Sequence, residues 1–253
     1  MILESFSLKD KVAVVTGANT GLGQAICVAY AEAGAKVVGV GRSDMTETAE
    51  KIKQAGGVFK EVKADLMNIE PVEKIIEETI NTFGRIDILV NNAGIIKRED
   101  ALDFTEKNWD DVLGINLKTV FFLSQAAAKK FVEQKSKGKI INIASMLSYQ
   151  GGIRVPSYTA SKSGIMGLTR ALANEWAKYD INVNAIAPGY MATNNTQQLR
   201  DDEQRQNQIL ERIPAGRWGV PKDMMGPAVF LASDASDYVN GYTIAVDGGW
   251  LAR

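Results

Sequence analysis

The feature that most constrains the fold is a regular alternation of short apolar runs with longer stretches of helical periodicity. Runs such as 12–16 and 139–143 are β-branched and nearly all apolar, which is typical of strands covered by helices on both faces. Strands are predicted at residues 12–16, 36–41, 58–63, 88–91, 139–143, 182–187 and 243–246. Helices are predicted between them, at 21–33, 46–55, 71–83, 109–133, 158–179 and 221–232. The pattern predicts a doubly wound α/β fold with a parallel seven-stranded sheet.

The organisation of the chain is simple. No break in composition divides the 253 residues, so we expect a single domain of this Rossmann type. A polar stretch at 193–212, rich in Asn, Gln, Asp and Arg, interrupts the alternation and is suited to a small lid. The first residues lack the basic and apolar regions of a signal peptide, and no uncharged run is apolar enough to cross a membrane. We therefore expect a cytoplasmic protein.

The composition of the chain excludes several kinds of catalytic site, metal site and partner. The chain has no histidine, which excludes Ser-His-Asp triads, His-ligated zinc and a histidine base. Cys27 is the only cysteine, so neither an intrachain disulfide nor a paired-cysteine metal motif can form. Lys and Arg number 29 against 30 Asp and Glu, a net charge of −1, which gives no attraction for nucleic acid or an anionic membrane. We expect no metal, and any proton transfer must use Tyr, Lys, Asp or Glu.

A glycine-rich turn follows the first predicted strand and precedes an apolar helix. In this setting Gly17, Gly21 and Gly23 permit a tight turn and let backbone N–H groups approach a pyrophosphate at the helix N-terminus. The spacing, Gly-x-x-x-Gly-x-Gly, departs from the common dinucleotide fingerprint. A plain glycine-rich turn therefore remains an alternative on these residues alone.

A second constellation consists of Tyr158 and Lys162, which lie four residues apart and share one face of a predicted helix. An ammonium beside a phenol favours the phenolate and lowers its pKa from ~10. A shift of ~3 units requires ~4 kcal/mol, so Lys162 would need help from a cofactor's positive ring or from desolvation. Ser145 follows the fifth strand, at the sheet edge where open α/β folds bind ligands. Asn116 lies in an apolar helical stretch, where a buried amide needs partners.

Together these motifs resemble the classical short-chain dehydrogenase/reductase family over essentially the whole chain. The resemblance is carried by residues 16–23, Asn91-Asn92-Ala93-Gly94, Asn116, Ser145, Tyr158 with Lys162, Pro188-Gly189 followed by Thr193, and Asp247-Gly248-Gly249. It implies a cofactor half at about 1–137 and a catalytic and substrate half at about 138–253. It also implies a catalytic tetrad of Asn116, Ser145, Tyr158 and Lys162.

The same resemblance implies which residues hold a nicotinamide cofactor. Asp65 would hold the adenine, Asn92 to Gly94 would line the adenosine side, and Thr193 would meet the nicotinamide carboxamide. The full expected set is Gly17, Asn19, Thr20, Gly21, Leu22, Gly23, Arg42, Asp65, Leu66, Asn92, Ala93, Gly94, Tyr158, Lys162, Pro188, Gly189 and Thr193.

Within the family, the chain is similar to the group named 2-deoxy-D-gluconate 3-dehydrogenases or 2-dehydro-3-deoxy-D-gluconate 5-dehydrogenases. Segments 143–158, 187–196, 212–219 and 247–253 carry this similarity and surround the expected substrate pocket. The similarity implies reversible transfer of a hydride between NAD(P) and a secondary hydroxyl or ketone of a deoxy sugar acid, in a homotetramer. Expected substrate residues are Ser145, Gln150, Arg154, Tyr158 and Arg217, with either arginine available for a bidentate pair with the substrate carboxylate.

Three alternatives remain on the sequence alone. A 3-oxoacyl-carrier-protein reductase or another polyol dehydrogenase would share the tetrad, and a nicotinamide-binding regulator would have lost turnover. The adjacent Lys129 and Lys130 are thin support for an acidic carrier-protein partner.

Cofactor choice depends on the end of the second strand. Gly41 stands where NAD-preferring relatives carry an acidic residue, and Arg42 is available to bind a 2′-phosphate. Two observations favour NAD instead. Thr20 stands where NADP-dependent relatives often have a basic residue, and the similar group is mostly associated with NAD. We expect both cofactors to be accepted, with a slight preference for NADP.

Overall fold

A computed structural model describes all residues of the chain, 1–253. Its seven strands form one fully parallel sheet in the order β3-β2-β1-β4-β5-β6-β7. The strands are β1 (Val12–Thr16), β2 (Lys36–Gly41), β3 (Val58–Lys63), β4 (Ile88–Asn91), β5 (Gly138–Ile143), β6 (Ile181–Pro188) and β7 (Thr243–Val246). The strand order reverses between β1 and β4, and ligands of open α/β sheets bind at such a switch point.

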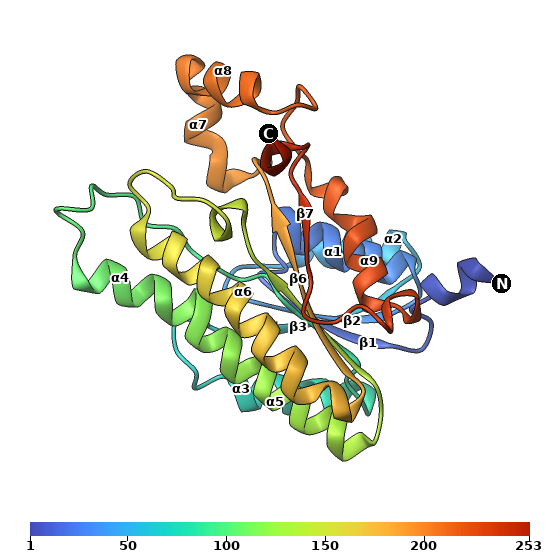
Figure 1. Ribbon diagram of the computed structural model, residues 1–253. Helices are drawn as coiled ribbons and strands as arrows, with labels where there is room; N and C mark the ends of the chain where they lie inside the picture. Colours follow the sequence, from blue (N-terminus) through green and yellow to red (C-terminus); the bar gives the residue numbers. More distant parts are fainter.

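Helices cover both faces of the sheet (Figure 1). One face carries α1 (Gly21–Glu32), α2 (Thr46–Gln54) and α9 (Met225–Ala232), and α1 contacts each of the other two. The other face carries α3 (Val72–Phe83), α5 (Thr119–Gln134) and α6 (Pro156–Trp176), and α4 (Glu106–Leu113) packs against α6. Two short helices, α7 (Gln197–Asp201) and α8 (Glu203–Arg212), project beyond the sheet beside the C-terminus (Figure 1).

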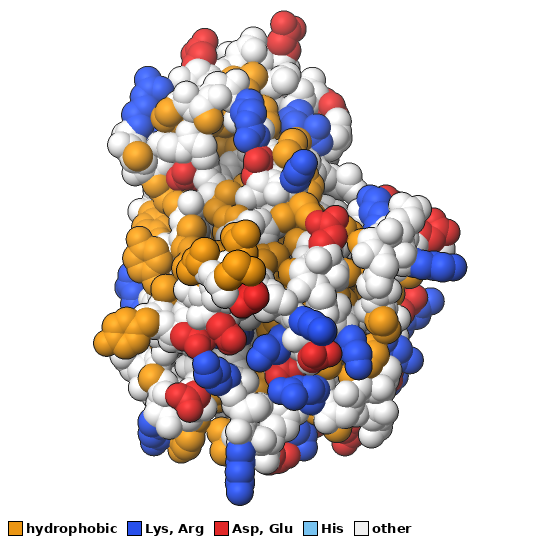
Figure 2. Space-filling view, turned by 90° about the vertical axis from the view of Figure 1, so that its right-hand side faces the viewer, with side chains coloured by type: hydrophobic (Ala, Val, Ile, Leu, Met, Phe, Trp, Pro, Cys, Tyr) orange, Lys and Arg blue, Asp and Glu red, His pale blue; other side chains and the backbone are white.

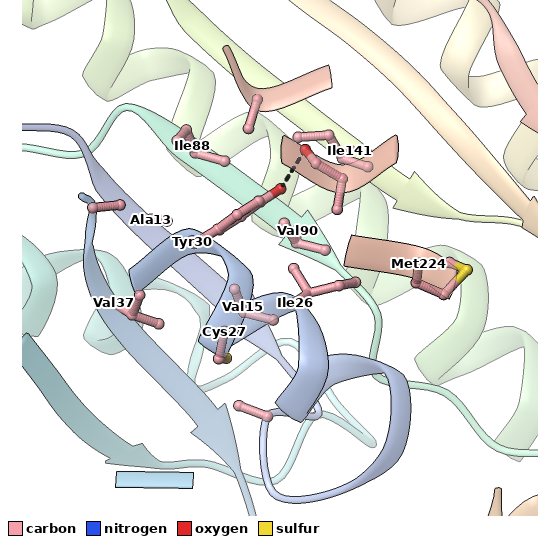
Figure 3. Packing of buried hydrophobic residues seen from close by; sticks show 14 of the residues in the cluster. Ala13, Val15, Ile26, Cys27, Tyr30, Val37, Ile88, Val90, Ile141 and Met224 are labelled. Carbon is pink, nitrogen blue, oxygen red and sulfur yellow. Dashed lines mark hydrogen bonds between the residues drawn. The ribbon is translucent and has the colours of Figure 1, made fainter. Parts of the chain in front are cut away.

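The hydrophobic core lies in two layers, one on each side of the sheet. Alternate strand residues point to opposite layers, so Val15 packs with the α1 and α9 side whereas Val14 packs with the α3 and α5 side. Tyr30 of α1 is fully buried in the first layer, and its hydroxyl donates a hydrogen bond to the Ala228 carbonyl at 3.2 Å (Figure 3). This bond satisfies the one polar atom of a large buried ring.

The predicted strands and the alternation are confirmed, with shifts of one residue at the ends of β5 and β6. The single helix predicted at 109–133 is instead α4, a π-helical turn η2 (Gly114–Lys118), and α5. The stretch 193–212 contains α7 and α8, a helical arrangement that its polar composition did not predict. Short 3-10 turns are η1 (Ile2–Phe6), η3 (Met146–Ser148), η4 (Ala177–Tyr179), η5 (Asn194–Thr196), η6 (Pro221–Met224), η7 (Asp234–Ser236) and η8 (Trp250–Ala252).

The mixture of acidic and basic side chains on the surface agrees with the net charge of −1. On the face shown in Figure 2, basic and acidic side chains are interspersed, and hydrophobic side chains gather above them. None of the helices has both the length and the apolar character needed to span a bilayer.

Candidate active site

A cleft of about 1380 Å³ opens at the carboxyl ends of the strands. Its lining comes from the turns after β1, β2, β3 and β4, from the segment between β5 and α6, and from the segment after β6, including α7 and α8. All these turns meet at one sheet edge because the strands are parallel, so residues far apart in the sequence share one wall.

Hydrogen bonds join the turn after β1 to the turn after β4 beneath the cleft. The Thr16 hydroxyl accepts hydrogen bonds from the backbone N–H groups of Asn92, at 3.0 Å, and Ala93, at 2.9 Å. The Asn92 side-chain amide donates back to the Thr16 carbonyl at 2.8 Å. These bonds fix the glycine-rich turn against the end of β4, so the floor of the cleft is preorganised.

The glycine-rich turn fits a dinucleotide pyrophosphate. Gly17 and Gly21 have φ values of +66° and +58°, which L side chains rarely adopt. A Cβ atom on Gly23 would lie only 2.1 Å from the Gly17 carbonyl oxygen, so a side chain there would push the turn away from α1. With no side chain in the way, the N-terminal N–H groups of α1 remain open toward the cleft.

Most residues expected to hold the cofactor line the cleft. Those lining it are Gly17, Asn19, Thr20, Gly21, Leu22, Arg42, Asp65, Leu66, Asn92, Ala93, Gly94, Tyr158, Lys162, Pro188, Gly189 and Thr193. Gly23 of the expected set does not line it and instead packs beneath the turn.

On the adenosine side, Arg42 and Asp65 form a loose, exposed ion pair with 3.7 Å between the guanidinium Nη1 and the carboxylate Oδ2. No Cβ atom stands at Gly41, and one built there would have no neighbour nearer than 3.8 Å. The end of β2 therefore presents a guanidinium that is only loosely paired and no carboxylate at position 41, an arrangement that can accept a 2′-phosphate.

Ser145, Tyr158 and Lys162 converge on the other half of the cleft. Ser145 leaves β5 and begins η3, with its hydroxyl accepting a hydrogen bond from the Leu147 N–H at 3.1 Å. Tyr158 and Lys162 lie one turn apart on α6, and the Lys162 ammonium is 5.6 Å from the centroid of the phenol ring. The structure thus brings together three of the four residues expected in the tetrad around open space.

The titration behaviour of this group is set mainly by burial. Burial raises the pKa of Tyr158, while hydrogen bonding with Ser145 and the positive charge of Arg98 act to lower it. Burial also lowers the pKa of Lys162 to about 8. In the protein alone the pKa of the phenol is raised, because desolvation outweighs the nearby charges. The expected lowering depended on a cofactor's positive ring or on desolvation, and desolvation here acts in the opposite direction.

Asn116, the fourth expected residue, lies behind the cleft in the π-helical turn η2 and does not line it. Its side chain accepts from the Ile95 N–H at 2.9 Å and donates to the Ile95 carbonyl at 3.0 Å and to the Ser161 hydroxyl at 3.2 Å. Both amide hydrogens are used, so only one lone pair of Oδ1 remains for a water molecule. Asn116 joins the loop after β4 to α6.

The two arginines expected to bind a substrate carboxylate differ in position. Arg217 does not line the cleft, and its guanidinium forms a bidentate pair with Asp223 at 2.7 and 2.9 Å. The structure therefore does not support the expected contact of Arg217 with a substrate, because its donors already have a partner. Arg154 does line the cleft, with its Nε 3.1 Å from an Asp100 carboxylate oxygen.

Other cleft residues were not named individually as site residues from the sequence. Arg98, in the loop after β4, lines the cleft and donates to the Asn195 carbonyl at 3.2 Å. Arg205, Arg212 and Trp250 also line it. A basic residue soon after the Asn-Asn-Ala-Gly motif was an available signal for Arg98, whereas Trp250 lies in segment 247–253, which the family similarity had already placed around the substrate pocket.

Comparisons with known proteins agree with this architecture. A family model described as enoyl-(acyl carrier protein) reductase matches residues 17–251. A 2-dehydro-3-deoxy-D-gluconate 5-dehydrogenase of Escherichia coli K12 is 67% identical over 253 residues, the full length of both chains.

Solved structures give the same result. A protein of Agrobacterium tumefaciens described as a 2-deoxy-D-gluconate 3-dehydrogenase, solved with bound NADP, is 54% identical with a TM-score of 0.94, covering 98% of this chain and 99% of that one. A gluconate 5-dehydrogenase of Burkholderia cenocepacia, in complex with NADP and tartrate, is 36% identical with a TM-score of 0.95 over 100% of both chains. The likeness extends over the sheet, the glycine-rich turn and the cleft, and on this evidence the chain belongs to the short-chain dehydrogenase/reductase family.

Proposed function

We propose that this chain is an NAD(P)-dependent oxidoreductase that interconverts a secondary hydroxyl and a ketone of a deoxy sugar acid of the 2-dehydro-3-deoxy-D-gluconate class. The observation that carries the proposal is the charge of the cleft around Ser145 and Tyr158. Four arginines line the cleft from the loop after β4, the segment between β5 and α6, and α8, namely Arg98, Arg154, Arg205 and Arg212, of which Arg154 is paired with Asp100. The acidic lining residues, Glu47 and Asp65, lie away from Ser145 and Tyr158, after β2 and β3. An acid is therefore favoured over a neutral polyol. The named activities of the relatives support the same substrate class.

A bound nicotinamide cofactor supplies the hydride acceptor or donor. In the oxidation, Tyr158 takes the proton of the substrate hydroxyl at its phenolic oxygen, and in the reduction it returns that proton. Ser145 donates a hydrogen bond to the substrate oxygen and keeps it near the phenol. Lys162 would stabilise the phenolate through its positive charge and would hold the ribose hydroxyls of the cofactor.

Two further residues support this group. Arg98 places a second positive charge near the phenol, which favours the phenolate needed for the oxidation. Asn116 acts as a positioning residue, because it fixes the loop at Ile95 and the helix at Ser161. A water molecule relaying protons toward Lys162 would donate to the remaining lone pair of Asn116.

For the cofactor, the glycine-rich turn would hold the pyrophosphate, and Asp65, with Asn92 to Gly94, the adenosine. Arg42 would bind a 2′-phosphate where one is present, so NADP is accepted with a slight preference over NAD. The NADP seen in the two solved relatives supports this assignment.

We also propose that the chain works as a homotetramer in the cytoplasm. Large exposed hydrophobic side chains, among them Trp109, Val132, Tyr238 and Tyr242, would be covered by subunit contacts. Size-exclusion chromatography with light scattering tests the assembly.

The test of function is a coupled absorbance screen of hexonates, deoxyhexonates and their keto forms, each with NAD and with NADP. Neutral polyols and a 3-oxoacyl thioester serve as comparison substrates. We expect kcat/KM to be highest for a deoxy sugar acid. Preference for the thioester or for a neutral polyol would contradict the proposal, and absence of turnover with every substrate would favour a regulator.

A further inference from the structure

The side chain of Gln150 is held by two donors from distant parts of the chain. Its carbonyl oxygen Oε1 accepts from the Trp250 indole N–H at 3.2 Å and from the Arg212 guanidinium Nη2 at 3.3 Å. Gln150 follows η3, Trp250 begins η8 near the C-terminus, and Arg212 ends the lid helix α8. All three line the cleft. We call the contact of Gln150 with Trp250 and Arg212 the junction. Figure 1 shows the C-terminus beside α7 and α8.

The Trp250 ring makes the junction rigid. The Arg212 guanidinium lies 4.0 Å above the centroid of the Trp250 ring, and the Tyr190 ring packs edge-on against it with 4.9 Å between centroids. Trp250 itself is 4% exposed. A buried ring held on two sides has little rotational freedom, so the direction of its N–H is fixed.

This geometry fixes which end of the Gln150 amide faces its neighbours. An indole N–H and a guanidinium can only donate, so the Gln150 oxygen must face them and the NH2 group must face elsewhere. That NH2 group makes no hydrogen bond within the chain. The Gln150 oxygen is thus occupied by Trp250 and Arg212. Because Gln150 lines the cleft, its NH2 group is available there to donate two hydrogen bonds.

We propose that Gln150 is a specificity-determining residue whose fixed NH2 group donates to the carboxylate or the adjoining keto oxygen of the sugar acid, with Trp250 and Arg212 as positioning residues. This inference rests on the proposed function. Oxygen atoms with lone pairs and no hydrogen are the groups that two N–H donors select. The positive charge of Arg212 beside the amide adds attraction for a carboxylate.

The Gln150→Glu substitution tests the donor role, because a glutamate still accepts from Trp250 and Arg212 but has no N–H to donate. Its negative charge also opposes a carboxylate. We expect KM for 2-dehydro-3-deoxy-D-gluconate to rise about 10- to 150-fold, the range for losing a hydrogen bond to a charged group, with a smaller change in kcat. The Tm increase that the sugar acid produces in the presence of NADP should be lost in parallel.

Trp250→Phe tests the positioning role, since it keeps a ring against Tyr190 and Arg212 but removes the indole N–H. KM should rise by a smaller factor than in Gln150→Glu, with kcat retained. Gln150→Ala provides the donor test should the glutamate variant fail to fold. Arg217→Ala is the matched control, because Arg217 lies outside the cleft and should leave KM unchanged.

Unchanged KM and unchanged ligand-induced Tm shift in Gln150→Glu, or in Gln150→Ala, would overturn the inference while the wild type still turns over sugar acids. A wild type without such turnover would instead overturn the proposed function, so the two failures are distinct.

Discussion

The Lys162 ammonium donates a hydrogen bond to the backbone carbonyl of Ile143 at 2.5 Å, which joins the second turn of α6 to the last residue of β5. The bond holds the ammonium at the sheet edge, 5.6 Å from the Tyr158 ring centroid. Lys162 is only 5% exposed, and burial lowers its pKa to about 8. Placing this charge at the site therefore has a cost in stability that depends on pH.

The pH dependence of that cost gives the first prediction. An unfolded lysine keeps its proton up to a pKa of ~10.4, whereas the folded Lys162 loses it near 8. Between these values the unfolded state binds more protons, so stability rises with pH. Below pH 8 both states are protonated and the full cost remains. Lys162→Met removes this contribution, so the wild type should gain stability relative to the variant from pH 8 to pH 10.5, by up to ~3 kcal/mol.

Urea unfolding of both proteins at several pH values measures the difference. The value at any one pH also includes loss of the bond to Ile143, so the slope with pH is the quantity that decides. A difference in unfolding free energy that is flat between pH 7 and 10.5 would show that Lys162 is not desolvated in the folded protein.

Tyr158→Phe should abolish most turnover because it removes only the transferable proton. A general acid–base group contributes ~10²- to 10⁴-fold, so kcat should fall by that factor while folding and nucleotide binding are kept. Circular dichroism and nucleotide titration serve as controls. A fall in kcat of less than about tenfold would contradict the role of Tyr158 as the proton-transfer group.

Removing the charge of Arg98 should change the pH profile of the oxidation. The positive guanidinium lowers the pKa of Tyr158, so Arg98→Ala should raise the apparent pKa above which kcat/KM reaches its plateau. Arg98→Lys keeps the charge and should restore much of the profile. Superimposable profiles for the wild type and Arg98→Ala would exclude an electrostatic effect of Arg98 on the phenol.

Cofactor preference should respond to two substitutions at the end of β2. Arg42→Ala removes the charge available to a 2′-phosphate, and kcat/KM for NADP should fall by ~10- to 150-fold with little change for NAD. In Gly41→Asp the added Cβ atom meets only ordinary van der Waals contacts, and the carboxylate is placed to repel the phosphate and to accept from a ribose hydroxyl. It should shift preference to NAD. If NADP kinetics are the same in Arg42→Ala and the wild type, Arg42 does not bind the phosphate.

The architecture could be predicted from the sequence, and so could the positions of the glycine-rich turn, Ser145, Tyr158 and Lys162 at one edge of the sheet. Alternation of apolar runs with helical patterns specifies a parallel sheet covered on both faces, because only that arrangement buries both sides of such strands. Parallel strands bring their carboxyl ends to one edge, so the turn at Gly17 and the residues Ser145 and Tyr158 had to meet there. Helix-face spacing likewise placed Lys162 beside Tyr158.

Which polar groups are free to act depends on contacts between residues that are distant in the sequence. Arg154 and Arg217 looked alike in the sequence, but Asp223 occupies the Arg217 guanidinium whereas Arg154 lines the cleft. Burial, which no local pattern reports, raises the pKa of Tyr158 in the protein alone, so the expected lowering of that pKa depends on a bound cofactor. Trp250 reaches Gln150 across 100 residues of sequence, and such a contact exists only after the C-terminal segment has packed against the segment that follows η3. Local sequence fixes periodicity and turn chemistry, while pairing, burial and charge at the site depend on long-range packing.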